Sequence, residues 1–79
     1  MTISAEISLY PLRTADLSTP IGSFLDRLQE TGITVEPGPM SSRITGECSE
    51  VFRALGDAFE KGAEQDEVVL VMKVSNACG

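Results

Sequence analysis

The stretch ISAEISLYPL, residues 3–12, alternates apolar and polar side chains and determines the predicted fold. An alternation with a period of two is typical of a β-strand that packs one face on a core. This strand is expected to stop at Pro11. One face holds Ile3, Ala5, Ile7 and Leu9, and the other holds Ser4, Glu6, Ser8 and Tyr10. The second face is compatible with solvent exposure, with a lined pocket or with a contact between subunits.

The first predicted helix follows a polar connection at residues 13–18. Thr19 and Pro20 are typical of an N-cap and a first helical position. Gly32 is suited to end the helix in a left-handed conformation. Between these signals, one apolar stripe with helical spacing consists of Ile21, Phe24, Leu25 and Leu28.

The next segment predicts two short strands joined by a turn. The first strand is ITVEP, residues 33–37, and Gly38-Pro39 supplies the turn. The second strand is expected over residues 40–46, with Met40, Ser42 and Ile44 on one inward face. The opposite face is expected to hold Ser41, Arg43, Thr45 and Glu47.

A second helix and a last strand complete the chain. Ser49 is the expected N-cap of this helix, and Gly62 is its expected end. Its apolar stripe consists of Val51, Phe52, Leu55, Ala58 and Phe59. The run EVVLVMKVSN, residues 67–76, predicts the last strand, in which Lys73 can face Glu6 across neighbouring strands.

The order of these elements is βαββαβ. Two amphipathic helices of similar length can both cover one face of a four-stranded antiparallel sheet. Right-handed crossovers then give a ferredoxin-like α+β sandwich with the first and third strands in the centre. Because no linker or low-complexity tract interrupts the pattern, we expect one domain over residues 1–79.

Composition excludes several classes of function. The chain has 79 residues and a net charge of −6, which disfavours binding to nucleic acid. It lacks a long apolar run and a signal-peptide pattern, so we expect a cytoplasmic protein without a membrane partner. Reduced Cys48 and Cys78 are expected in that compartment. Since the chain contains no histidine, we expect no metal site and no cofactor.

Three motifs together resemble the YkoF-like thiamine-binding proteins. They are SLYP at residues 8–11, GPMSSRITGE at 38–47 running into EVF, and KVSNACG at 73–79. The resemblance implies a non-enzymatic cytoplasmic domain that binds thiamine or its hydroxymethylpyrimidine half, in vitamin uptake, salvage or sensing. It also implies self-assembly through the sheets as a dimer or tetramer. The positions that carry over are Ser8, Tyr10, Ser41, Ser42, Ser75 and Cys78.

The chemistry of an aminopyrimidine adds further candidates. Its exocyclic amine needs an acceptor, which Glu6 or Glu47 can supply, and Asn76 can donate or accept at a strand end. A tyrosine ring can stack on the flat heterocycle. The full candidate ligand site is Glu6, Ser8, Tyr10, Ser41, Ser42, Glu47, Ser75 and Asn76.

Two alternative functions stay open at this point. The uncovered face of the sheet can serve only for self-association, as a homo-oligomerising interaction module without a small ligand. An enzyme that uses Glu6 or Glu47 as an acid or base is the remaining alternative.

Overall fold

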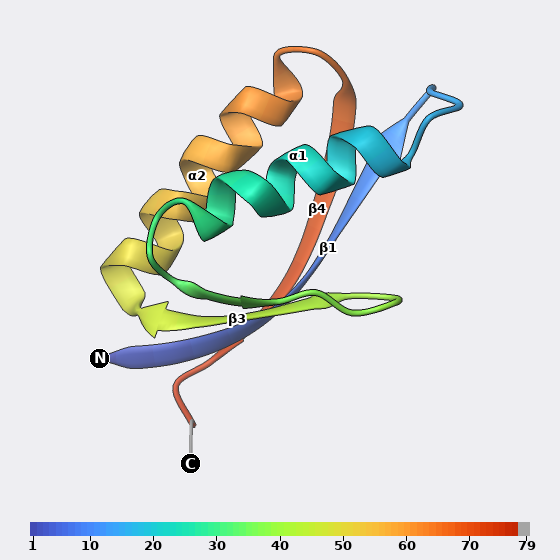
Figure 1. The fold of residues 1–79 in the computed structure, drawn as a ribbon. Coiled ribbons are helices and arrows are strands. Elements are labelled where there is room, and N and C mark those ends of the chain that lie inside the picture. The colour runs from blue at the N-terminus through green and yellow to red at the C-terminus, as the bar shows by residue number, and fades with distance from the viewer. Residues whose placement is uncertain (78–79) are drawn as a thin grey trace.

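The computed structural model describes residues 1–77 and has the predicted βαββαβ order. Its sheet has four antiparallel strands in the order β2-β3-β1-β4, so the first and third strands are central, as predicted (Figure 1). The fold is therefore the ferredoxin-like α+β sandwich. The elements are β1 (Thr2–Leu12), α1 (Ser18–Gln29), β2 (Thr34–Glu36), β3 (Ser42–Glu47), α2 (Cys48–Ala63) and β4 (Glu67–Ser75).

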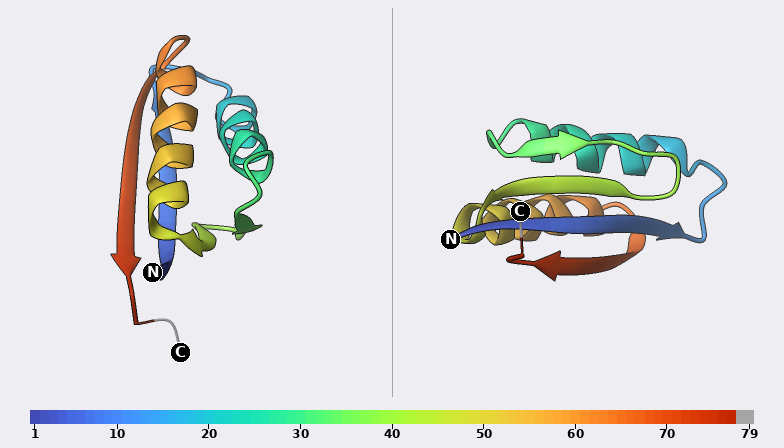
Figure 2. Two further views of the ribbon diagram at one scale, coloured as in Figure 1. Left: turned by 90° about the vertical axis from the view of Figure 1, so that its left-hand side faces the viewer. Right: turned by 90° about the horizontal axis from the view of Figure 1, so that it is seen from below.

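Both helices lie on the same face of the sheet (Figure 2, left). The alternation in β1 directs its apolar side chains into the core, where they are buried against the stripes of the helices. Full burial of one such leucine, valine or phenylalanine contributes about 1.5–3 kcal/mol, so these stripes hold the helices on the sheet. The buried helical residues are Phe24, Leu28, Val51, Ala54, Leu55 and Ala58.

One residue of the predicted second stripe is not in the core. Phe52 is 47% exposed, so its assignment to the core is wrong, and Ala54 is buried in the same turn. The helix turns its narrow alanine side toward α1 and the sheet, which leaves Phe52 on the outer surface. A prediction that places only large apolar residues in the core overlooks Ala54, whose small side chain lets α2 pack closely on its neighbours.

Both helices begin two residues earlier than predicted. α1 starts at Ser18 because the Asp16 carboxylate accepts a hydrogen bond from the Thr19 backbone N–H at 3.1 Å, which places the cap before Thr19. α2 starts at Cys48, whose N–H donates to the Met1 carbonyl oxygen at 2.9 Å. Gly32 has the predicted left-handed conformation, with φ of 86°.

The uncovered face of the sheet carries the predicted polar side chains. Glu6 lies opposite Arg43 on β3 and opposite Lys73 on β4, which confirms the expected register. Tyr10 lies opposite Val69 and is 51% exposed, so no helix covers this side. The face that the helices leave open is therefore the face with the hydroxyls, the phenol and charges of both signs.

β1 extends beyond β3, and this difference in length creates a notch in the sheet. The last pair between β1 and β3 is Ile7 with Ser42, whereas the pairing with β4 continues to Leu12. β1 also runs through Pro11, so the predicted stop at that residue is wrong. Beyond Ile7 the strand is an edge on its β3 side, which is the setting in which a strand tolerates a residue without an N–H.

Candidate functional site

A cavity of about 260 Å³ fills the notch where β1 extends beyond β3. Residues 7–11 of β1 form one side, the first two turns of α1 form a second, and the loop before β3 forms a third. The cavity thus lies at an edge of the sheet, between the strand layer and α1. Its lining consists of Ile7, Ser8, Leu9, Tyr10, Pro11, Leu17, Ile21, Phe24, Leu25, Gly38, Pro39, Met40, Ser41 and Ser42.

The inner wall of the pocket is apolar except for one hydroxyl. Ile7, Leu9 and Phe24 belong to the buried core and give this wall a hydrocarbon surface. Ser42 is only 7% exposed, and its hydroxyl makes no hydrogen bond within residues 1–77. In that part of the chain, every side-chain oxygen that is fully shielded from solvent has a hydrogen-bond partner. Since the Ser42 hydroxyl has none, it is not fully shielded, and it opens onto the pocket that Ser42 lines. It is a free donor and acceptor on an apolar wall.

The loop at residues 37–41 forms the outer side of the pocket. Its conformation is fixed by one hydrogen bond and by a tight turn at Gly38. The Ser8 Oγ donates a hydrogen bond to the Met40 carbonyl oxygen at 3.3 Å. At Gly38, an added Cβ would lie 2.5 Å from the Ser41 carbonyl oxygen, so the turn requires glycine there. Pro37 and Pro39 restrict the backbone on both sides of Gly38. The loop thus forms a fixed outer wall of the pocket. Residues 40 and 41 do not extend β3 as predicted, and Met40, expected on the inward face with Ile44, is 88% exposed because it lies in the loop.

The pocket has no formal charge. None of the described residues that line it is an Asp, Glu, Lys or Arg. Asp16 directly precedes Leu17 of the lining, and hydrogen bonds from Thr19, first from its side chain and then from its backbone, lower the pKa of Asp16. Arg13, in the same loop, forms an ion pair with Glu67. The charged groups of Asp16 and Arg13 therefore interact with other residues of the chain and not with the pocket.

The structure brings four of the eight predicted site residues together. They come from β1, from the loop before β3 and from the first residue of β3, and they are the hydroxyl-bearing residues of the pocket lining: Ser8, Tyr10, Ser41 and Ser42. Glu6 lies outside the lining, on the uncovered face, two residues before Ser8 on β1. At about 3.4 Å per residue it lies roughly 7 Å from Ser8 along the strand.

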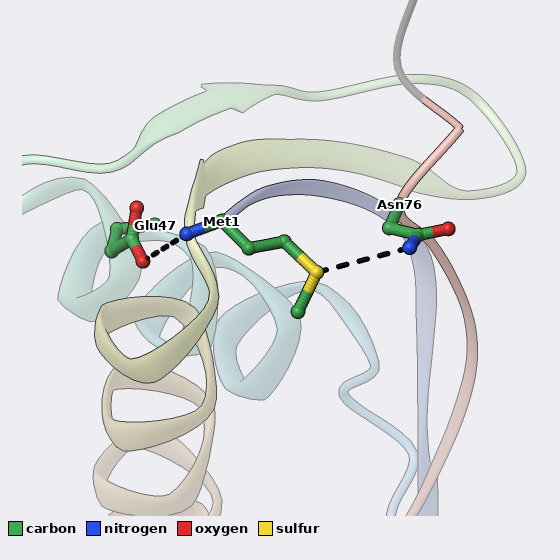
Figure 3. Close-up of polar contacts among 3 residues, drawn as sticks. All are labelled: Met1, Glu47 and Asn76. Atoms are coloured by element: carbon green, nitrogen blue, oxygen red, sulfur yellow. Dashed lines mark hydrogen bonds and ion pairs between the residues drawn. The ribbon is translucent and has the colours of Figure 1, made fainter.

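The other three predicted residues lie at the opposite end of the sheet. The Met1 amino group contacts the Glu47 Oε1 at 2.6 Å, and the Asn76 Nδ2 lies 3.8 Å from the Met1 sulfur (Figure 3). Ser75 lies opposite Ser4, which is about 14 Å along β1 from Ser8. Contact with Glu47 raises the pKa of the Met1 amine, chiefly through the hydrogen bond. One small ligand in the pocket of a single chain does not span this separation.

Sequence reasoning missed the helical wall of the pocket, formed by Leu17, Ile21, Phe24 and Leu25. Three of these residues were assigned to the core stripe, yet Ile21 and Leu25 are only partly buried. The feature that indicates this wall is an apolar stripe in the first turns of a helix that packs on a strand with no paired strand on one side. Recognising it requires the relative lengths of β1 and β3.

The remaining expectations concern metals, membranes and cysteines. Among residues 1–77, no three His, Cys, Asp or Glu residues are grouped closely enough to hold a metal ion. The described part of the chain has no helix of the length and hydropathy that crossing a membrane requires. Cys48 is a free cysteine packed against the core, and Cys78 lies outside the described residues.

Comparison with known proteins gives one family and several similar structures. Residues 5–78 match the family described as thiamine-binding protein. A protein of Streptococcus pneumoniae is 24% identical with a TM-score of 0.90, and the match covers 99% of this chain and 89% of that one. A hypothetical protein of Methanocaldococcus jannascii is 23% identical with a TM-score of 0.87, with coverage of 98% and 81%.

A third similar structure has a description related to a vitamin. It is a protein of Thermotoga maritima that its description assigns provisionally to thiamine biosynthesis or salvage. It is 19% identical with a TM-score of 0.68, and the match covers 95% of this chain and 83% of that one. At these identities the solved structures establish the fold alone. A search of curated proteins finds no match.

Proposed function

We propose, because this chain belongs to the family of thiamine-binding proteins, that its edge pocket binds thiamine or the hydroxymethylpyrimidine half of thiamine. The family is described by binding and not by a reaction. The pocket-lining hydroxyls of Ser8, Tyr10, Ser41 and Ser42 are the proposed ligand contacts. Glu6 is the proposed acceptor at the rim, and Glu47, Ser75 and Asn76 lie too far away to share that pocket within one chain.

The single observation that carries this proposal is the free hydroxyl of Ser42 on the apolar wall. Because this hydroxyl opens onto the pocket and has no partner among residues 1–77, a ligand in the pocket can donate a hydrogen bond to it or accept one from it. An aminopyrimidine has flat apolar faces and donors and acceptors around its edge. Such a ring can pack on Phe24 while its edge bonds to the serine hydroxyls.

The size of the cavity favours the pyrimidine as the part that is enclosed. Pockets that bury a drug-sized ligand have volumes of about 300–1,000 Å³. A cavity of about 260 Å³ is below that range and suits a single ring with its substituents. In this arrangement the thiazolium ring of thiamine extends out of the pocket, where the net charge of −6 favours a cation.

We propose that the protein acts by binding and not by catalysis. The chain contains no histidine, and no carboxylate or lysine lines the described part of the pocket. A role in uptake, salvage or sensing of the vitamin within the cytoplasm is the biological setting of the proposal.

Isothermal titration calorimetry and thermal unfolding with thiamine and hydroxymethylpyrimidine test the proposal. At about 100 times the dissociation constant, a ligand adds about 2.7 kcal/mol to the free energy of unfolding. For so small a domain, the melting temperature then rises by roughly 10 °C or more. Nicotinamide, a ring of similar size without the aminopyrimidine pattern, is the control. No heat and no shift with either vitamin compound would contradict the proposal.

A second candidate function, self-association, rests on the uncovered face of the sheet. Tyr10, Val69 and Val71 form an exposed apolar patch there, because Val71 lies opposite Ser8, beside Tyr10. Next to this patch Glu6 is flanked by Arg43 and Lys73, so the face has both signs of charge in a chain of net charge −6. A second copy can meet this face without net repulsion, which supports a dimer or tetramer formed through the sheets.

Light scattering after gel filtration tests the oligomer. The full chain should have a multiple of the monomer mass, and Val71→Lys should shift it to the monomer. Phe52→Lys is the matched control, since Phe52 is similarly exposed but lies on α2. A monomer at every concentration, or equal dissociation by both variants, would contradict this candidate.

A further inference from the structure

We infer that the pocket selects unphosphorylated ligands and discriminates against their phosphate esters, because every usual phosphate-binding element near it is missing or occupied. This inference rests on the proposed function and names the chemical class of ligand that the site takes. Proteins hold phosphate groups with arginine or lysine side chains, or with the free N–H groups at the N-terminus of a helix.

Cationic side chains do not reach the pocket. None of the described residues in its lining is a lysine or arginine. Arg43 directly follows Ser42 of the lining, but it lies opposite Glu6 on the sheet, as does Lys73. Arg13 is paired with Glu67. The other three cations lie on the helices, where they line grooves that are separate from this pocket: Arg27, Arg53 and Lys61.

The helix N-terminus next to the pocket is occupied by a carboxylate. α1 begins at Ser18, directly after Leu17 of the pocket lining, so its first N–H groups lie near the rim. The Asp16 Oδ1 accepts from the Thr19 N–H at 3.1 Å and thus fills the position that a phosphate oxygen would take. The low pKa of Asp16 keeps this group anionic at neutral pH. A ligand phosphate would meet a negative charge where a phosphate site has a positive one.

The electrostatic field of the whole chain acts in the same direction. A net charge of −6 repels a phosphate ester and attracts the thiazolium cation of free thiamine. The absence of charge in the described pocket lining leaves an enclosed phosphate with no compensation for its lost hydration. Hydroxymethylpyrimidine, which is neutral, meets neither penalty.

Calorimetric titration of the full chain with two matched pairs of ligands tests the inference. Hydroxymethylpyrimidine is compared with its phosphate, and thiamine with thiamine diphosphate. We expect each ester to bind on the order of tenfold more weakly than its parent. The ratio of the affinity for thiamine to the affinity for thiamine diphosphate should decrease as the salt concentration rises from about 0.01 M to 0.15 M. Salt screens the interaction between the ligand and protein charges that lie farther away than the Debye length.

Asp16→Asn separates the local effect from the overall charge. Asparagine keeps an oxygen acceptor for the Thr19 N–H but removes the charge, so the ratio of affinities should narrow by about two- to fivefold. Asp57→Asn, on the exposed side of α2, makes the same change in net charge and should leave the ratio unchanged.

The possible outcomes distinguish this inference from the proposed function. Equal or tighter binding of the esters would overturn the inference and leave the proposed function standing. If neither parent compound bound, the proposed function would fail, and the inference would fail with it. An equal response of Asp16→Asn and Asp57→Asn would refute the role assigned to the helix terminus.

Discussion

Ser8 and Met40 are 32 residues apart in the sequence and are joined by a hydrogen bond from the Ser8 Oγ to the Met40 carbonyl oxygen. This bond connects the part of β1 that has no paired strand on its β3 side to the loop that precedes β3. The loop thereby becomes the outer wall of the cavity beside the first two turns of α1. Closure of the proposed site depends on this contact between strand and loop.

Replacing Ser8 by alanine should weaken ligand binding more than it weakens the fold. The bond lies near the surface, so its loss should lower the free energy of unfolding by less than about 1 kcal/mol. Without it the loop at residues 37–41 is freer, and affinity for hydroxymethylpyrimidine should fall by about three- to tenfold. Urea unfolding and calorimetry measure the two effects, with Ser49→Ala on α2 as the control. An unchanged affinity would argue against this role of the loop.

Ser42→Ala should separate binding from stability more clearly. Because the Ser42 hydroxyl has no partner among residues 1–77, its removal breaks no hydrogen bond there. The free energy of unfolding should change by no more than about 0.5 kcal/mol. Affinity for hydroxymethylpyrimidine should fall about tenfold, since the ligand loses a buried hydrogen bond. A strong loss of stability with normal affinity would show that the hydroxyl is structural.

Two glycine-to-alanine substitutions should affect different properties: Gly38→Ala should lower ligand affinity, and Gly56→Ala should raise the free energy of unfolding. In Gly38→Ala the new Cβ meets the Ser41 carbonyl oxygen, so the loop must move and ligand affinity should fall. In Gly56→Ala the new Cβ has no atom within 4 Å, and alanine stabilises a helix interior by up to about 1 kcal/mol. Thermal unfolding and calorimetry on both variants test this pair. Equal affinities would show that the turn at Gly38 does not shape the pocket.

Acid should remove the stabilisation that Asp16 provides. Hydrogen bonds from Thr19 lower the pKa of Asp16 in the folded chain below its ordinary value of 3.8. The unfolded chain therefore binds the proton more readily, and this contribution is lost as the pH falls from above 3.8 through the folded pKa. The difference in urea midpoint between the wild type and Asp16→Asn should shrink from pH 7 to pH 3. A difference that stayed constant or grew would contradict this assignment.

Much of the fold could be predicted from the sequence because the local signals agree with one another. The alternation in residues 3–12 gives the strand and both of its faces, and the stripe with Phe24 and Leu28 gives the buried side of α1. Pairing of Glu6 with Lys73 follows from the order of the strands. The errors have local and distant causes. The local one is Asp16, which caps α1 three residues before Thr19. The distant ones are Met1, which contacts the start of α2, and the close packing that buries Ala54 in place of Phe52.

The candidate site could be predicted only in part. Four residues were expected to converge because they lie on neighbouring central strands, and all four are in the pocket lining: Ser8, Tyr10, Ser41 and Ser42. Their contact with a ligand stays a prediction. The opposite group, with Glu47 and Asn76, could not be separated from them without the register, which places it at the other end of β1. The wall formed by Leu17 was hidden because it depends on how α1 crosses the open part of β1.

The proposed pyrimidine site is tested most directly by a titration of ¹⁵N-labelled protein with hydroxymethylpyrimidine, followed by two-dimensional NMR. We expect the largest amide shifts at the non-proline residues of 7–11 and 38–42 and at Leu17, Ile21, Phe24 and Leu25, which line the cavity. The amides of Glu47, Ser75 and Asn76 should move little. Largest shifts at those three residues, or no shifts at saturating ligand, would contradict a pyrimidine site at this edge of the sheet.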